Sequence, residues 1–188
     1  MDHRSYTMDS YSKIAKAQGY RSRASLKLLE IDQKHKIFKP TQKVLDLGCA
    51  PGGWSQVAYE KVGDKGLVVG IDILPTQPYK NVQFIQADFQ QTILQTEFDV
   101  VLSDVCANKT GNCFIDDLTM FEFGKQLLNK AQSSLSAKGW FVCKFFYSIY
   151  EKEFNTLLCT KFKSVKKYKP NASRSCSSEF YYIGQCLI

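Results

Sequence analysis

The segment Asp46-Leu47-Gly48-Cys49-Ala50-Pro51-Gly52-Gly53-Trp54 leaves few choices of architecture. It follows a short apolar run, Val44 to Leu47, and precedes a helix-like run, Ser55 to Val62. A glycine-rich turn between a strand and a helix brings backbone N–H groups and a helix N-terminus against a ligand. Three residues separate Gly48 from Gly52, so the spacing differs from that of the dinucleotide fingerprint G-x-G-x-x-G. This difference disfavours a nicotinamide enzyme. For the glycines alone, a tight turn without a ligand remains the alternative.

Strand-like and helix-like runs alternate along the rest of the chain. The strand-like runs are 44–48, 67–72, 82–87, 100–104, 140–146, 164–168 and 180–187, and the helix-like runs are 12–17, 22–35, 55–62, 118–135 and 150–162. This order predicts an α/β fold, Rossmann-like, with a seven-stranded, mainly parallel sheet and helices on both faces. Only a loop separates the last two runs, so the last strand should be antiparallel. We expect Ser22 to cap the second helix and Gly139 to form a helix-to-strand turn.

Composition indicates one domain over 1–188, with 1–40 as an N-terminal helical extension. Hydrophobic and charged contents of 44% and 23% are typical of a globular protein, and no apolar run is long enough to span a membrane. The seven cysteines are odd in number and form no C-x-x-C, and there are only two histidines. These counts favour reduced thiols in an intracellular protein and no metal site.

The net charge of +7 makes a polyanionic partner plausible, against the alternative of a merely basic surface. Basic residues gather near both ends of the chain. They are Lys13, Lys16, Arg21, Arg23 and Lys27, and then Lys161, Lys163, Lys166, Lys167, Lys169 and Arg174. We expect the two groups to form one RNA-facing surface.

Acidic residues end three successive strand-like runs: Asp72, Asp88 and Asp104. Each by itself is an ordinary way to close a strand, but three of them opposite a glycine-rich turn outline a nucleoside pocket. An acid at Asp72 can accept hydrogen bonds from ribose hydroxyls. Asp88 could contact an adenine amino group, with Phe89 near the ring.

Lys144 interrupts the apolar run Trp140 to Phe146, where a lysine is unfavourable unless it is paired. We expect it to pair with Asp104 at the carboxyl edge of the sheet; a snorkelling lysine is the alternative. Glu179 opens the last strand-like run. Lys27, taken alone, would be a solvated helix residue.

With these motifs assembled, nearly the whole chain resembles the FtsJ-type ribosomal-RNA 2′-O-ribose methyltransferases. The matching segments are Ser22 to Ile31, Asp46 to Gln56 with Pro-Gly-Gly-Trp-Ser-Gln intact, Ser103-Asp104 with Asn108 to Gly111, the Lys144 strand, and the segment from Ser173-Arg174 to Glu179. The resemblance implies a methyltransferase fold that uses S-adenosylmethionine and no metal. It also implies a catalytic tetrad of Lys27, Asp104, Lys144 and Glu179. Its cofactor-binding positions would be Gly52, Gly53, Trp54, Asp72, Asp88 and Asp104.

The resemblance implies methyl transfer to a ribose 2′-hydroxyl, of a uridine in large-subunit ribosomal RNA, by a monomer. A transfer-RNA 2′-O-methyltransferase and a non-catalytic RNA-binding protein on the same fold are the alternatives. The intact Gly52-Gly53 pair and the compact length favour the ribosomal branch. The chain departs from the family at Cys106-Ala107, where Ala-Pro is usual, and at Ser178, where a basic residue is frequent.

Overall fold

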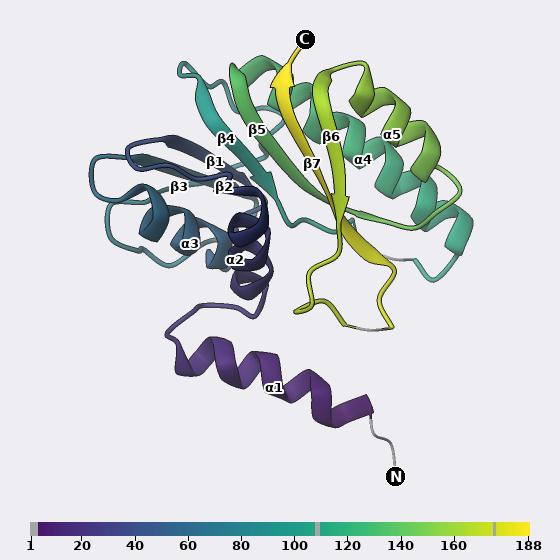
Figure 1. Ribbon diagram of the computed structural model, residues 1–188, viewed down its shortest axis with the longest axis horizontal. Coiled ribbons are helices and arrows are strands. Elements are labelled where there is room, and N and C mark those ends of the chain that lie inside the picture. The colour runs from purple at the N-terminus through teal and green to yellow at the C-terminus, as the bar shows by residue number, and fades with distance from the viewer. Residues whose placement is uncertain (1–3, 108–109, 175) are drawn as a thin grey trace.

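The computed structural model describes residues 4–107, 110–174 and 176–188, and a single seven-stranded sheet organises them (Figure 1). The strands lie in the order β3-β2-β1-β4-β5-β7-β6. They are β1 Lys43–Leu47, β2 Leu67–Asp72, β3 Gln83–Gln86, β4 Phe98–Ser103, β5 Leu135–Phe146, β6 Phe162–Tyr168 and β7 Glu179–Leu187. Strands β1 to β5 are parallel, and β7 runs antiparallel to both β5 and β6, so the predicted α/β architecture is confirmed.

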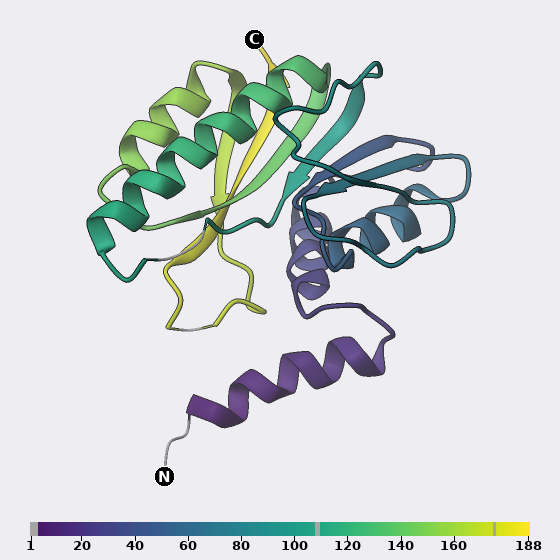
Figure 2. The ribbon, with the colours of Figure 1, turned by 180° about the vertical axis from the view of Figure 1, so that it is seen from behind.

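Helices cover both faces of the sheet, as Figures 1 and 2 show from opposite sides. The helices are α1 Arg4–Ala17, α2 Ala24–His35, α3 Gly53–Val62, α4 Cys113–Ser134 and α5 Glu151–Cys159. Helices α2 and α3 bury Leu28 and Val57 against one face. Helices α4 and α5 bury Leu127 and Phe154 against the other. The connection between β3 and β4 contains no helix, as its short length predicts.

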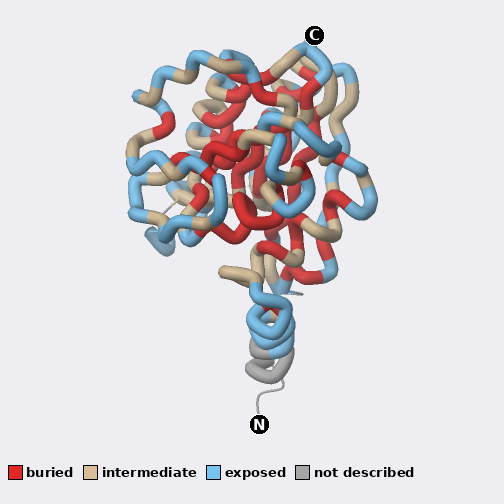
Figure 3. Tube along the Cα trace, turned by 90° about the vertical axis from the view of Figure 1, so that its left-hand side faces the viewer, coloured by how far each residue is buried: buried red, intermediate tan, exposed pale blue. Residues whose placement is uncertain are grey.

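Helix α1 extends beyond the body of the molecule, on the side where the β6–β7 loop lies (Figures 1 and 2). Most of its described side chains are exposed, whereas Ala15 is buried (Figure 3). The helix begins earlier than the predicted run 12–17. Within the described residues, none of the helices combines the length and apolar character that a bilayer crossing requires.

Two local predictions are wrong. Arg23, not Ser22, precedes α2, and no side chain caps that helix. The Ser22 hydroxyl instead lies close to Gly53, so it fills space between α2 and α3. Gly139 lies within β5 and not in a turn, because that strand begins directly after α4. The pairing of β5 with β4 shifts in register between Phe98 and Val100.

Candidate functional site

The glycine-rich loop between β1 and α3 is shaped by close approaches that exclude larger residues. Gly48 has φ of +73°, and a Cβ there would lie 1.6 Å from the Val105 side chain. Gly52 has φ of +97° and directly precedes α3, and a Cβ there would lie 2.9 Å from the Arg21 guanidinium. The loop therefore packs against the segment that follows β4 at Gly48 and against Arg21 at Gly52, where α3 begins.

Gly53 and Trp54 join the start of α3 to α2. The Ser25 hydroxyl donates to the Gly53 carbonyl at 2.9 Å, and the Trp54 indole N–H donates to the Ala24 carbonyl at 2.8 Å. Trp54 is buried between the helices, which directs its ring into the protein rather than into an open site. These contacts fix α2 relative to the loop.

The two acids predicted to bind a nucleoside lie where β2 and β3 end. Asp72 accepts from the backbone N–H of Ala50 and of Leu74, both at 2.8 Å. Asp88 accepts from the backbone N–H of Gln90 at 2.9 Å. Asp72 thus braces the glycine-rich loop with part of its acceptor capacity, and a carboxylate has further lone pairs for a ligand.

Asp46 lies beneath this loop and is buried. It accepts from the Ser55 hydroxyl at 2.6 Å. Burial raises the pKa of Asp46 to about 7, against the opposing effect of the Ser55 hydrogen bond and with added repulsion from Asp104 and Asp72. This acid anchors the first turn of α3 from within the core.

Lys144 and Asp104 form the centre of the site. Ser103 and Cys143 are register partners in β4 and β5, so Asp104 and Lys144 follow side by side. The Lys144 ammonium donates to the Asp104 carbonyl at 2.5 Å and lies 3.3 Å from its carboxylate. Lys144 is 9% exposed, so the predicted pairing at the sheet edge is present and the lysine does not snorkel.

Lys27 and Glu179 form a second, buried ion pair with Nζ and Oε1 2.6 Å apart. Lys27 is 4% exposed, so it is not the solvated residue that its helix alone suggests. Burial, the largest influence, would raise the pKa of Glu179. The hydrogen bond and charge of Lys27, together with the charge of Lys144, outweigh it and hold that pKa below its ordinary value.

Tyr181 connects the two pairs, and the sequence analysis did not single it out. Its hydroxyl donates to the Asp104 carboxylate at 2.7 Å, and its ring centroid lies 5.8 Å from the Lys27 ammonium. Burial, followed by the charge of Asp104, raises its pKa well above the ordinary value, so the phenol remains a donor. The sequence does indicate its position, because side chains two residues apart in a strand lie on the same face, so Tyr181 shares a face of β7 with Glu179.

Arg21 is half-buried, and backbone carbonyls hold its guanidinium, which the sequence places in a basic surface. Its guanidinium donates to the carbonyls of Gln77 and Pro78 at 2.6 and 2.5 Å, and to that of Pro51 at 3.4 Å. It also lies over the Tyr79 ring at 5.1 Å. Arg21 therefore ties the N-terminal segment to the glycine-rich loop, and with the buried Lys27 it leaves the set of candidate RNA contacts.

Basic side chains of α2 and β6 lie near one another, although Lys34 belongs to neither of the two groups named from the sequence. The Lys34 ammonium lies 4.4 Å from the centroid of the Tyr168 ring, which His35 contacts edge-on. Burial lowers the pKa of His35, and the nearby charges of Lys166 and Lys34 lower it further. Helix α2 and strand β6 thus contribute to one positive surface.

The described part of the chain has no cluster of three or more His, Cys, Asp and Glu side chains that could hold a metal ion. All seven cysteines are free thiols. Asn108 and Lys109, part of one motif named above, lie outside the described residues.

Comparison with known proteins gives consistent matches over most of the chain. A model of the FtsJ-like methyltransferase family matches residues 20–186. A Coxiella burnetii protein named ribosomal RNA large subunit methyltransferase E is 42% identical, over 95% of this chain and 90% of its own length. A protein of the same name from Acinetobacter baumannii strain AYE is 40% identical, over 97% of this chain and 88% of its own length.

Solved structures agree with the fold. A Plasmodium falciparum protein provisionally named a ribosomal RNA methyltransferase superposes with a TM-score of 0.81 and 27% identity, over 89% of this chain and 98% of its own. A Clostridium thermocellum protein provisionally named an rRNA methylase superposes with a TM-score of 0.59 over 85% of this chain and 97% of its own; at 20% identity it shows the fold alone.

Proposed function

The chain belongs to the FtsJ-like methyltransferase family, and on that premise we propose that it transfers a methyl group from S-adenosylmethionine to a ribose 2′-hydroxyl of large-subunit ribosomal RNA. The observation that carries the proposal is the convergence of Lys27, Asp104, Lys144 and Glu179 at one edge of the sheet. The names of the relatives favour a ribosomal over a transfer RNA. A uridine is the proposed nucleotide.

The residues around the glycine-rich loop fit S-adenosylmethionine. Helix α3 begins at Gly53, directly after Gly52, and its first N–H groups have no partners within the helix and suit a carboxylate. Asp72 retains acceptor sites for ribose hydroxyls, and the apolar residue Ile73 beside it is 69% exposed. Asp88 and the backbone around Trp54 complete the proposed cofactor site, which Asp104 borders.

The donor supplies a methyl group on a positively charged sulfur, and this chain's residues prepare the attacking oxygen. We assign Lys144 to orient the 2′-hydroxyl and, in its neutral amine form after loss of a proton to solvent, to take the hydroxyl proton. Asp104 holds the Lys144 nitrogen through both its carbonyl and its carboxylate. Positioning of the reacting groups can supply much of the rate acceleration, which is why buried, mutually held side chains suit this reaction.

The other charged groups keep that geometry. Tyr181 donates to Asp104 on the oxygen that faces Lys144, and so fixes the carboxylate. The Lys27–Glu179 pair brings α2 to the start of β7. All four proposed catalytic residues come from one chain, so a monomer can form the site.

We further propose that the chain is one methyltransferase domain and that residues 1–40 face the RNA. Exposed lysines of α1 and of β6 lie on elements that flank the active-site edge (Figure 1). Their positive charge suits phosphates, which dominate affinity in RNA–protein complexes.

Cofactor binding is expected to depend on the acids at the strand ends. Replacing both Asp72 and Asp88 with alanine should abolish saturable S-adenosylmethionine binding in isothermal titration, because the ribose and adenine contacts are then lost. Asp64→Ala, at an exposed acid after α3, is the control. Unchanged binding by the double variant would place the cofactor elsewhere.

RNA affinity is expected to fall steeply with salt, because bound lysines release counterions from phosphates. Glutamate at Lys13, Lys16 and Lys166 should weaken binding and flatten this salt dependence, whereas Arg21→Lys should leave it unchanged. Filter binding over a range of potassium chloride concentrations measures both. A flat response in the wild type would argue against phosphate contacts.

The reaction itself is tested with a large-subunit ribosomal RNA transcript and S-adenosylmethionine. Nuclease digestion and mass spectrometry should reveal a single 2′-O-methylated nucleoside. Methylation only of transfer RNA, or only of a base, would reject the proposed function.

A further inference from the structure

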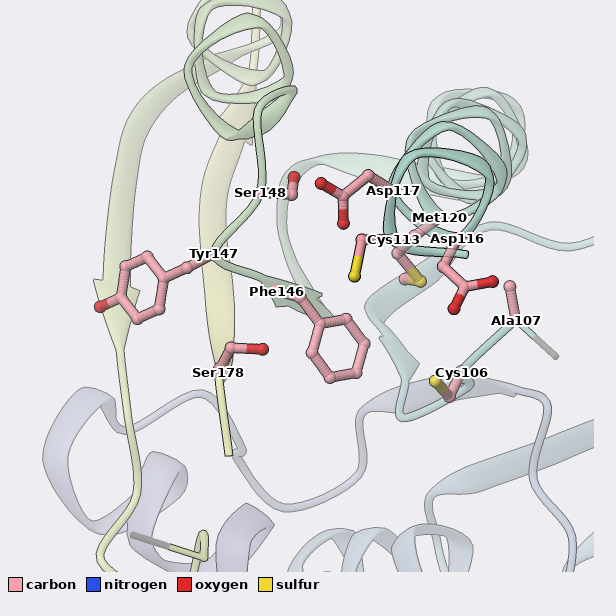
Figure 4. Close-up of a pocket in the computed structure, with 10 residues that line it drawn as sticks. All are labelled: Cys106, Ala107, Cys113, Asp116, Asp117, Met120, Phe146, Tyr147, Ser148 and Ser178. Atoms are coloured by element: carbon pink, nitrogen blue, oxygen red, sulfur yellow. The ribbon is translucent and has the colours of Figure 1, made fainter. Parts of the chain in front are cut away.

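A pocket of about 310 Å³ opens beside the proposed tetrad, and neither the proposed cofactor site nor the proposed tetrad uses it (Figure 4). Its walls come from the loop after β4, the first turns of α4, the end of β5 and the residue that precedes β7. None of the residues assigned to the methyl donor lines it, so it is separate from the proposed cofactor site.

The pocket borders the tetrad on two sides. Cys106 in its wall lies two residues beyond Asp104, and Ser178 directly precedes Glu179. Phe146, also in the wall, is the register partner of Glu179. A group that enters the pocket therefore lies next to the point where the hydroxyl would react.

The lining disfavours phosphate. Among the described residues, the lining contains no lysine or arginine but two carboxylates, Asp116 and Asp117. Asp116 is engaged with its own loop, because it accepts from the Thr110 N–H and hydroxyl at 2.7 and 2.8 Å. Asp117 accepts a long hydrogen bond, 3.4 Å, from the Ile149 N–H, the one that the described part of the chain gives it. It retains acceptor capacity for an N–H group of a ligand.

Two further groups suit a flat, polar-edged ligand. The Ser148 side chain lines the pocket, and its hydroxyl is buried and has no hydrogen-bond partner among the described residues, which is an unfavourable arrangement. The Phe146 ring reaches into the pocket between Ser178 and Cys106 in Figure 4. An aromatic face with one donor and one acceptor nearby matches the face and edge of a nucleobase.

We propose that this pocket binds the base of the nucleotide whose ribose is methylated. The inference rests on the proposed function, because the base is attached to the carbon next to the one that bears the 2′-hydroxyl. Phe146 packs against the base, while Asp117 and Ser148 contact its polar edge. A base held here is out of its stack, as in other enzymes that act on single nucleotides of folded nucleic acids.

The test compares two RNA substrates, the natural one and one that lacks the base at the methylated nucleotide. Base–aromatic stacking and edge contacts should make kcat/KM about 10- to 100-fold lower for the abasic RNA with the wild type. Cys113→Trp fills the pocket, so the kcat/KM of this variant on natural RNA should fall to a similar level. Removal of the base from the RNA should then lower its kcat/KM by less than about a further 3-fold. Cys159→Trp, the same change at an exposed cysteine of α5, should match the wild type.

Ser148→Ala provides a milder change in case Cys113→Trp disturbs folding. It should lower kcat/KM about 3- to 10-fold on natural RNA and leave the abasic RNA unaffected. Equal rates on the two RNAs with the wild type, or equal losses from Ser148→Ala on both, would overturn the pocket assignment. Transfer to natural RNA by the wild type tests the proposed function separately, so the two proposals can fail independently.

Discussion

Alanine in place of Lys144 is expected to lower single-turnover methyl transfer by about 10²- to 10⁴-fold, the usual contribution of general-base assistance. Lys144 touches Asp104 through two atoms and lies where the hydroxyl must be held. Cofactor and RNA binding should be retained, because neither proposed binding surface includes this side chain. Transfer and thermal unfolding are measured on the same preparation.

Lys138→Ala, at an exposed lysine near the other end of β5, is the matched control and should keep full activity. If Lys144 only stabilises the fold, a different result is expected. Its removal would lower the melting temperature while the folded fraction still transfers methyl groups at a near-normal rate. That result would remove Lys144 from the catalytic assignment.

Methionine in place of Lys27 is expected to lower the free energy of unfolding by about 3–5 kcal/mol, because it leaves the buried Glu179 without its partner. The melting temperature should fall by roughly 6–20 °C for a chain of this size. Calorimetry and urea unfolding measure the change. The double variant Lys27→Met/Glu179→Leu should recover most of this stability and remain inactive.

The same pair predicts a dependence on pH. The pKa of Glu179 is lower in the folded protein than its ordinary value of 4.5, so the ion pair stabilises the fold above that value. This stabilisation is lost as the pH falls through the folded pKa. The stability gap between wild type and Lys27→Met should therefore be full at neutral pH and narrow below about pH 4. A gap that does not change with pH would contradict the pairing.

The sheet could be predicted from the sequence because its signals are local. The apolar runs that end in Asp72 and Asp104 are short, and each is followed by turn residues or by a helix-like run. The glycine-rich loop could be predicted equally well, since Gly48 and Gly52 occupy positions where positive φ and close packing demand glycine. The pairing of Lys144 with Asp104 followed from their positions at the ends of two strands.

The roles of other residues could not be predicted because they depend on contacts between distant segments. Lys27 looks solvated within its own helix, and only the packing of α2 against the start of β7 buries it. Tyr181 looks like an ordinary aromatic strand residue until its hydroxyl meets Asp104. Arg21 seemed to belong to a basic surface, yet carbonyls more than fifty residues away bind its guanidinium.

The most direct test of the proposed methyl transfer removes the attacking atom, the ribose 2′-oxygen, from the substrate. The nucleotide that mass spectrometry identifies as methylated is replaced by its 2′-deoxy form in an otherwise identical RNA. We expect methyl incorporation at that nucleotide to disappear while the RNA still binds, because the tetrad acts on the 2′-oxygen and on no other atom. Continued incorporation into the 2′-deoxy RNA would show transfer to a base and would contradict the roles given to Lys144 and Asp104.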